Sequence, residues 1–318
     1  MIALILMVKP VISVSRDCNK SGGGSQSYFT APASAGMALP VVLMLLALLA
    51  ALTLQAQMAA RGRLAREQRA TAHARLRALA ADAAWQALRT LAEESEPALT
   101  HTNAGWSRPR EERLPDGTLL AVRVADAARL FNVNNLGVQS LTAGVARLPE
   151  TVAAELLAGA ECPAPVEVAA RLSDWFAGTE PGQTGAVMQS SGELLALAPA
   201  MPPERLAELF SVLPASGGGL TPVNVNTAPA AVLLGVLGQA RAFAAAALVQ
   251  RRDAQPLRSL ENFAFYDAIR DCEAYLDVRS LYFTVEARAE NAGGLVRIWA
   301  MAERDPMAQW RVRRWVCR

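Results

Sequence analysis

The residue types that most often carry enzyme chemistry are scarce in this chain of 318 residues. His73 and His101 are its only histidines, which disfavours a zinc site or a histidine general base. The four cysteines lie far apart and form no Cys-x-x-Cys pair, so a metal or redox motif is not indicated. No Ser-His-Asp arrangement and no phosphate-cradling glycine loop is evident in the sequence. We therefore predict that the chain is not an enzyme.

Length and composition instead favour a folded protein with a sizeable core. Hydrophobic residues make up 52% of the chain and charged residues 19%, which excludes a disordered tail or a coiled-coil rod. The formal net charge of +2 is too near neutral to indicate a nucleic-acid partner, and none is expected.

The strongest feature is an uncharged segment near the start of the chain. No charged residue occurs between Lys20 and Arg61, and Met37 to Leu54 is apolar apart from Thr53. A helix over this run spans roughly 27 Å, close to the hydrocarbon thickness of a bilayer. The run is unusually long and leucine-rich for a buried core helix, and somewhat long for a cleaved secretory signal. We predict a transmembrane helix at residues 37–60.

A polar, flexible stretch precedes this run and ends in Gly36. A glycine directly before a membrane helix resembles a type IV prepilin cleavage site, which predicts processing between Gly36 and Met37. Two features depart from that pattern. No basic residue lies close before Gly36, and the fifth mature position is Val41 where most prepilins have glutamate.

The distribution of charge, taken alone, favours the topology opposite to that of a pilin. Arg16 and Lys20 precede the span, whereas Arg61, Arg63 and several further arginines follow it. The positive-inside rule, used alone, places the C-terminal bulk in the cytoplasm. A pilin-like assignment places it outside, and we adopt that topology because of the resemblance described below.

The membrane helix is expected to continue far beyond the bilayer. From Arg61 to Glu94 the sequence has no proline, and apolar residues recur at three- and four-residue spacing until Pro97. We predict one helix from Pro40 to about Ser95. Its apolar stripe comprises Leu76, Leu79, Ala80, Ala83, Ala87, Leu88 and Leu91.

Strand patterns occur at both ends of the remaining sequence. A turn at Pro115-Asp116-Gly117 precedes a strand at about 119–124, and three strands are expected at about 278–289, 295–302 and 309–317. Helix signals dominate between them, which predicts an α+β protein with an inserted helical domain. The predicted divisions are a leader (1–36), a membrane helix (37–60), a helix with first strands (61–136), a helical insertion (137–277) and C-terminal strands (278–318).

The insertion contains one motif with two interpretations. Asn224 to Pro229 runs into a helix, Leu237 to Ala240 forms a short turn, and further helices follow, the last after Ser259. This resembles a helix-hairpin-helix, or SAM-like, unit, which often binds the DNA backbone. The second hairpin glycine and flanking lysines are missing here, so a structural role is favoured. A membrane-anchored DNA-binding protein and a minor pilin of a type IV pilus remain the alternative functions.

Together these motifs resemble the GspK family, the large minor pseudopilins of the type II secretion system. The motifs occur in the family's order: Gly36 before the membrane helix, Phe131 to Leu136, Asp174-Trp175-Phe176, Asn224 to Pro229, and Ser280 to Phe283.

The resemblance implies a pilin-like fold and a non-catalytic subunit at the tip of the periplasmic pseudopilus that helps initiate its assembly and protein export. It implies a single-pass protein of the bacterial inner membrane, with its bulk in the periplasm. It also implies cleavage and methylation by a prepilin peptidase, contact with minor pseudopilins I and J, and contacts with the secretin or exported proteins.

The resemblance further suggests a calcium site, because family members can bind calcium through acidic residues after the Asp-Trp phrase. Asp174 and Glu180 are the candidates, with an ordinary N-cap or ion-pair role for Asp174 as the alternative. No other cofactor is expected. In an oxidising compartment, one disulfide could form among Cys162, Cys272 and Cys317, and the sequence does not choose the pair.

Overall fold

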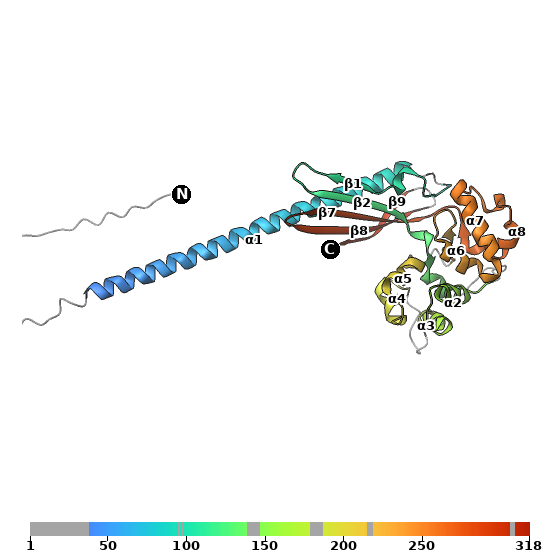
Figure 1. The fold of residues 1–318 in the computed structure, drawn as a ribbon, viewed down its shortest axis with the longest axis horizontal. Coiled ribbons are helices and arrows are strands. Elements are labelled where there is room, and N and C mark those ends of the chain that lie inside the picture. Colours follow the sequence, from blue (N-terminus) through green and yellow to red (C-terminus); the bar gives the residue numbers. More distant parts are fainter. Residues whose placement is uncertain are drawn as a thin grey trace, which may run out of the picture. The chain divides into compact units, whose positions relative to one another are not determined.

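A computed structural model describes residues 38–94, 96, 98–138, 147–178, 187–214, 219–305 and 309–318. The chain forms two compact units, Met1–Arg63 and Leu64–Arg318, which we describe separately. Figure 1 shows the order of the elements along the chain.

The described part of the first unit is helical. Helix α1 (Ala38–Glu94) begins here, and its described side chains up to residue 63 are exposed. The most apolar 18-residue window of this helix has a mean hydropathy of 2.3, and none of it is buried. This is the only described helix that is by itself long and apolar enough to cross a membrane. The predicted long helix is confirmed in extent.

In the second unit, the later part of α1 covers one face of an antiparallel sheet. Leu76, Ala80, Ala84 and Leu91 are at most 1% exposed and pack against inward-facing strand residues. The helical periodicity places these small and branched side chains on one stripe. The predicted apolar stripe is thus the contact between helix and sheet.

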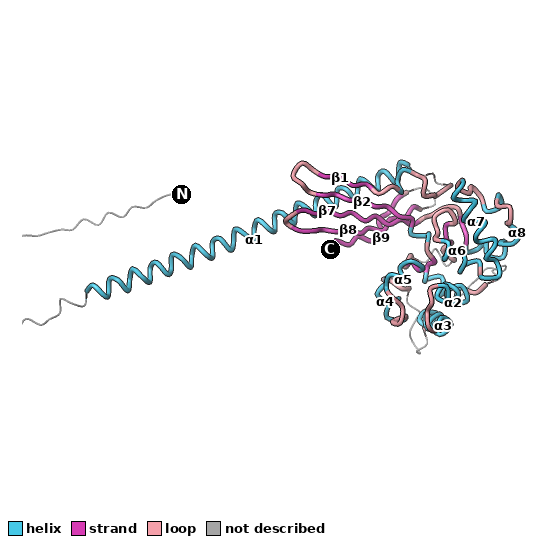
Figure 2. The backbone as a smooth tube through the Cα atoms, viewed as in Figure 1, coloured by secondary structure: helices cyan, strands magenta, loops and turns pink. Residues whose placement is uncertain are grey.

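The sheet has five strands in the order β1-β2-β7-β8-β9, with antiparallel neighbours throughout (Figure 2). The predicted turn closes the β1–β2 hairpin, where Gly117 adopts a φ of 83°. The first strand is absent from the sequence prediction because its four residues are all polar and exposed and show no alternation. The strands are β1 (Arg110–Arg113), β2 (Leu119–Asp126), β7 (Tyr282–Asn291), β8 (Gly294–Arg304) and β9 (Trp310–Cys317).

Short helices occupy the sequence between β2 and β7 and share a second core. Two two-stranded parallel pairs, β3–β4 and β5–β6, tie this region together. The helices are α2 (Pro149–Gly159), α3 (Pro165–Ala177), α4 (Ser191–Leu197), α5 (Pro203–Leu209), α6 (Ala230–Leu237), α7 (Ala242–Ala254) and α8 (Tyr266–Ile269). The short strands are β3 (Phe131–Asn132), β4 (Phe210–Ser211), β5 (Val223–Asn224) and β6 (Leu276–Asp277).

Two local features of this region lie next to the predicted motif. Pro229 occupies the N-cap position of α6, and the Thr227 hydroxyl donates to Asp126. The helix predicted after Ser259 is present as the four-residue α8, which is flanked by 3-10 turns.

Close packing of α2 against α6 depends on Gly235. A Cβ added at this position would lie 2.5 Å from Cδ2 of Leu156 and 3.3 Å from its Cα. We expect Gly235→Ala to lower the free energy of unfolding by about 1–3 kcal/mol, because the two helices must move apart. The matched control is Gly159→Ala, where no atom lies within 4 Å of the added Cβ. Urea titration of the full chain in detergent tests this, and an equal effect of the two substitutions would contradict it.

Candidate functional site

The asparagine-rich phrases that carry the family resemblance are buried. Their side chains bond to backbone groups distant in sequence, as shown by Asn132, which accepts from the Leu213 amide at 3.1 Å. A side-chain amide can both donate and accept, so it can replace a missing strand neighbour. The five residues are Asn132, Asn134, Asn135, Asn224 and Asn226, each at most 5% exposed.

Two asparagines of the first phrase each bind both backbone groups of one residue. Asn134 accepts from the Met188 amide at 2.8 Å and donates to its carbonyl at 3.1 Å. Asn135 does the same with Thr221, at 2.8 and 3.0 Å. The phrase therefore joins three segments of the helical region.

The second phrase joins the helical region to the sheet. Asn226 accepts from the Leu257 amide at 2.8 Å and donates to its carbonyl at 2.9 Å. Asn224 donates to the Thr100 carbonyl at 3.1 Å and to the Asp126 carboxylate at 2.8 Å. Asp126 is the last residue of β2, so this contact lies where the sheet meets the insertion.

Asp126 is the one described carboxylate that is almost completely buried, at 3% exposed. It accepts from Asn224, from the Thr227 hydroxyl at 2.6 Å and from the Ala128 amide at 2.8 Å. Burial nevertheless raises the pKa of this carboxyl above its ordinary value. The buried Arg304 lies in the same region and donates to the Ser280 carbonyl at 3.0 Å, and burial lowers its pKa.

The raised pKa of Asp126 predicts a pH-dependent stability. The unfolded carboxyl ionises near its ordinary pKa of 3.8, while the folded carboxyl retains its proton to higher pH. The free energy of unfolding should therefore fall as pH rises above about 4, until the folded carboxyl also ionises. We expect the Asp126→Asn chain to lose less stability over this range than the unchanged chain. Urea titrations at several pH values test this, and parallel pH profiles would contradict it.

The hairpin between α6 and α7 is bound by the protein's own side chains. The α6 axis and residues 239–254 meet at 111° across Gly238, which has a φ of 88°. The Arg147 guanidinium donates to the Gly235 carbonyl at 3.2 Å, and Arg241 donates to the Leu237 carbonyl at 3.3 Å. The hairpin amides are bonded as well, since Gly238 donates to the Leu234 carbonyl at 2.7 Å and Arg241 to the Gly238 carbonyl at 2.9 Å, which supports a structural role for the hairpin.

The predicted processing and calcium residues are only partly described. Gly36, Met37 and Glu180 lie outside the described residues. Asp174 lies within α3 and therefore does not cap it. Among the described residues no three histidine, cysteine or acidic side chains lie close enough to hold a metal. Asp174 alone cannot form a calcium site, because calcium takes six to eight oxygen ligands. Calcium stays a prediction, which chelation tested by the thermal unfolding of the full chain would check.

The three cysteines predicted as disulfide candidates are free thiols in the structure. Cys162 and Cys272 are buried in the core of the helical region, whereas Cys317 packs against the core between sheet and helix. Cys317 thus belongs to a different core from the other two. Burial raises the pKa of the Cys272 thiol, which disfavours its reactive thiolate.

The sequence analysis missed the two buried charges and the arginines on the outer face of the sheet. Asp126 and Arg304 stand in ordinary strand contexts, so nothing local marks them as buried. Two of the arginines did carry a signal, because Arg288 and Arg297 each stand between apolar residues in a predicted strand.

Comparison with known proteins supports the resemblance. The family model described as type II secretion system protein K matches residues 223–280, which include the second asparagine phrase. The crystal structure of the GspK–GspI–GspJ complex from enterotoxigenic Escherichia coli is similar, with a TM-score of 0.54 and 20% identity over 81% of this chain and 98% of that chain. No curated protein matches by sequence. The resemblance to the GspK family and the predicted α+β fold are confirmed.

Proposed function

We propose that this chain is a minor pseudopilin of a type II secretion system and assembles with minor pseudopilins I and J. Two findings on this one chain together support the proposal most directly. The protein K model matches residues 223–280, and the fold resembles that of GspK from a complex with GspI and GspJ. The chain is then a structural component of secretion, with no catalytic step of its own.

The apolar start of α1 supports a membrane-anchored subunit. Its exposed, apolar side chains suit a bilayer and not water. In this proposal residues 37–60 span the inner membrane, the C-terminal bulk lies in the periplasm, and a prepilin peptidase cleaves after Gly36 and methylates Met37.

The inserted helical region supports a place at the tip of the pseudopilus. It has a core of its own beside the pilin-like helix and sheet. A subunit with such added bulk would obstruct a further subunit placed above it, so it fits where the filament begins. Val41 agrees with this place, because the usual glutamate is thought to contact the subunit ahead. Initiation of assembly, with contacts to the secretin or exported proteins, follows from a tip position.

The deciding experiment is the intact mass and N-terminal sequence of the full chain, expressed with and without a prepilin peptidase. We expect a peptidase-dependent start at Met37 with one added methyl group. A chain that stays uncleaved, or is trimmed after residue 54, would overturn the pseudopilin assignment. Co-purification with minor pseudopilins I and J then separates this subunit from a type IV minor pilin.

A gel shift at low salt tests the DNA-binding alternative. Binding to phosphates should weaken steeply as salt rises. We expect no shift, because the hairpin amides of Gly238 and Arg241 already donate to the Leu234 and Gly238 carbonyls, at 2.7 and 2.9 Å. A salt-sensitive shift that is lost on substitution in the hairpin would favour that alternative.

A further inference from the structure

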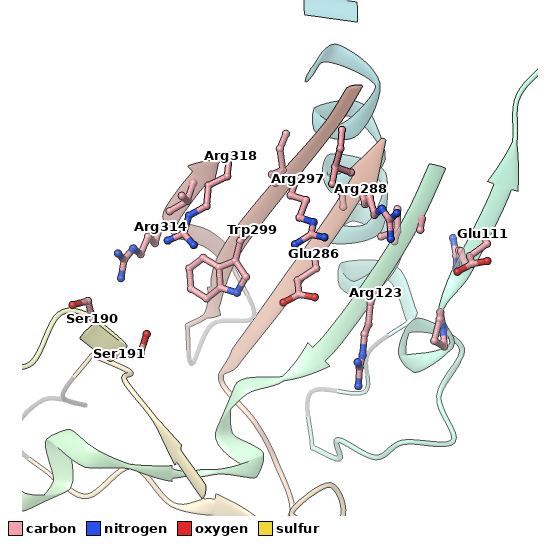
Figure 3. A pocket seen from close by; sticks show the side chains of 18 of the residues that line it. Glu111, Arg123, Ser190, Ser191, Glu286, Arg288, Arg297, Trp299, Arg314 and Arg318 are labelled. Carbon is pink, nitrogen blue, oxygen red and sulfur yellow. The ribbon is translucent and has the colours of Figure 1, made fainter. Parts of the chain in front are cut away.

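The face of the sheet opposite α1 forms a shallow groove that the proposed function does not use. Alternate strand residues point to this face, while their neighbours pack against α1. The start of α4, with Ser190 and Ser191, forms the other side of the groove (Figure 3). Its volume is about 1260 Å³.

Positive charge is concentrated in this groove. Six arginines and two glutamates line it, whereas the whole chain has a net charge of only +2. Arg288 and Arg297 are direct cross-strand partners, and like charges in that relation destabilise a sheet. The Arg288 guanidinium binds Glu290, yet its buried Nε has no hydrogen-bond partner. The sheet thus holds an unfavourable pair that an anion in the groove would relieve.

Two of these arginines are available to a ligand. Neither Arg123 nor Arg297 forms an ion pair or side-chain hydrogen bond with another described residue. Figure 3 shows both on the same face of the sheet as Glu286 and Trp299. Arg314 lies over the Trp299 ring at 5.8 Å and donates to the Gln189 carbonyl at 2.7 Å. That contact fixes the loop before α4 at the edge of the groove.

We propose that this groove binds an extended acidic segment of a partner protein. Arginine binds carboxylate with two parallel hydrogen bonds, and Trp299 offers an apolar surface to the segment's other side chains. Neighbouring strands lie about 4.8 Å apart, so the face from β2 to β9 spans roughly 14 Å, the length of four or five extended residues. This inference stands apart from the proposed function, since it rests on the sheet face alone.

The two glutamates favour a peptide over nucleic acid. Glu286 stands directly opposite Arg123 on β2 and directly opposite Trp299 on β8. A phosphate backbone carries a charge at every step and would be repelled there. A peptide with carboxylates at alternate positions can place an uncharged residue opposite Glu286.

The test measures binding of a fluorescein-labelled peptide of four glutamate-threonine repeats to the full chain in detergent, by fluorescence anisotropy. The matched probe has glutamine in place of glutamate. We expect at least tenfold tighter binding of the acidic peptide at low salt, weakening as salt rises. The double variant Arg123→Gln/Arg297→Gln should weaken it at least tenfold without loss of folding, because neither side chain has a hydrogen-bond or ion-pair partner within the described part of the chain.

The control variant is Arg171→Gln/Arg258→Gln, which removes the same charge from exposed positions outside the groove. We expect less than a twofold change in affinity. Equal binding of the two peptides, or equal weakening by the two double variants, would overturn the proposal. Displacement of the peptide by inorganic phosphate or a short oligonucleotide at lower concentration would also overturn it and assign the groove to phosphate ligands.

Discussion

Phe283→Ala is expected to lower the free energy of unfolding by about 3–5 kcal/mol, the usual cost of truncating a buried phenylalanine. Phe283 is completely buried at the contact between sheet and α1. Its ring lies 5.4 Å from Trp106 in an edge-to-face arrangement and 5.4 Å from Trp310. Removing the ring leaves a cavity and also removes both aromatic contacts, which stabilise the fold beyond the burial of the ring.

The matched control is Phe243→Ala, since the Phe243 side chain is 73% exposed. We expect a change within about 0.5 kcal/mol, as for most surface substitutions. Urea titration of the full chain, followed by tryptophan fluorescence, makes the comparison. A loss below about 1 kcal/mol for Phe283→Ala would contradict the packing of α1 on this sheet.

The choice of probe matters because the molecule has two cores. Five of the six tryptophans lie on α1, the sheet or the segment between them, and only Trp175 lies in the helical region. Tryptophan fluorescence therefore reports mainly on the unfolding of the sheet and its contact with α1. Circular dichroism in the near ultraviolet and limited proteolysis of the helical region would show whether the second core unfolds in the same step.

The elements with strong periodicity could be predicted from the sequence. The stripe from Leu76 to Leu91 and the alternating strands after residue 281 repeat the pattern of one buried face, so their type and approximate bounds follow directly. β1 could not be predicted, because both its faces are exposed and its sequence REER shows no alternation. It is a strand only because it pairs with β2.

The asparagine phrases show the limit of local reasoning more clearly. The sequence marked them only through their resemblance to a family. The structure instead uses Asn134 and Asn226 to bind segments 54 and 31 residues away. No local pattern indicates which distant backbone groups lack partners, so these contacts could not be derived from the sequence.

Asn224→Ala is expected to lower the free energy of unfolding by about 3 kcal/mol, although it removes only a small side chain. The substitution leaves the Thr100 carbonyl, the Asp126 carboxylate and the Asn226 amide without the partners they have at 2.8 to 3.1 Å. A buried polar group without a partner costs about 1–3 kcal/mol, and more when it is charged. Asn103→Ala is the control, because Asn103 is exposed and only its backbone is bonded.

The substitution Asn224→Asp distinguishes the effect of the lost hydrogen bonds on stability from the effect of an added charge. The aspartate can still accept from the Asn226 amide, but it places a second carboxylate beside Asp126, where Asn224 now donates at 2.8 Å. Two carboxylates at this distance cannot both ionise without a large cost, so one retains its proton. We expect the variant to be less stable than the alanine variant at neutral pH and to recover as pH falls towards 4, where both carboxyls can be protonated. A destabilisation that is equal at both pH values would show that Asp126 is not the buried charge around which this junction is built.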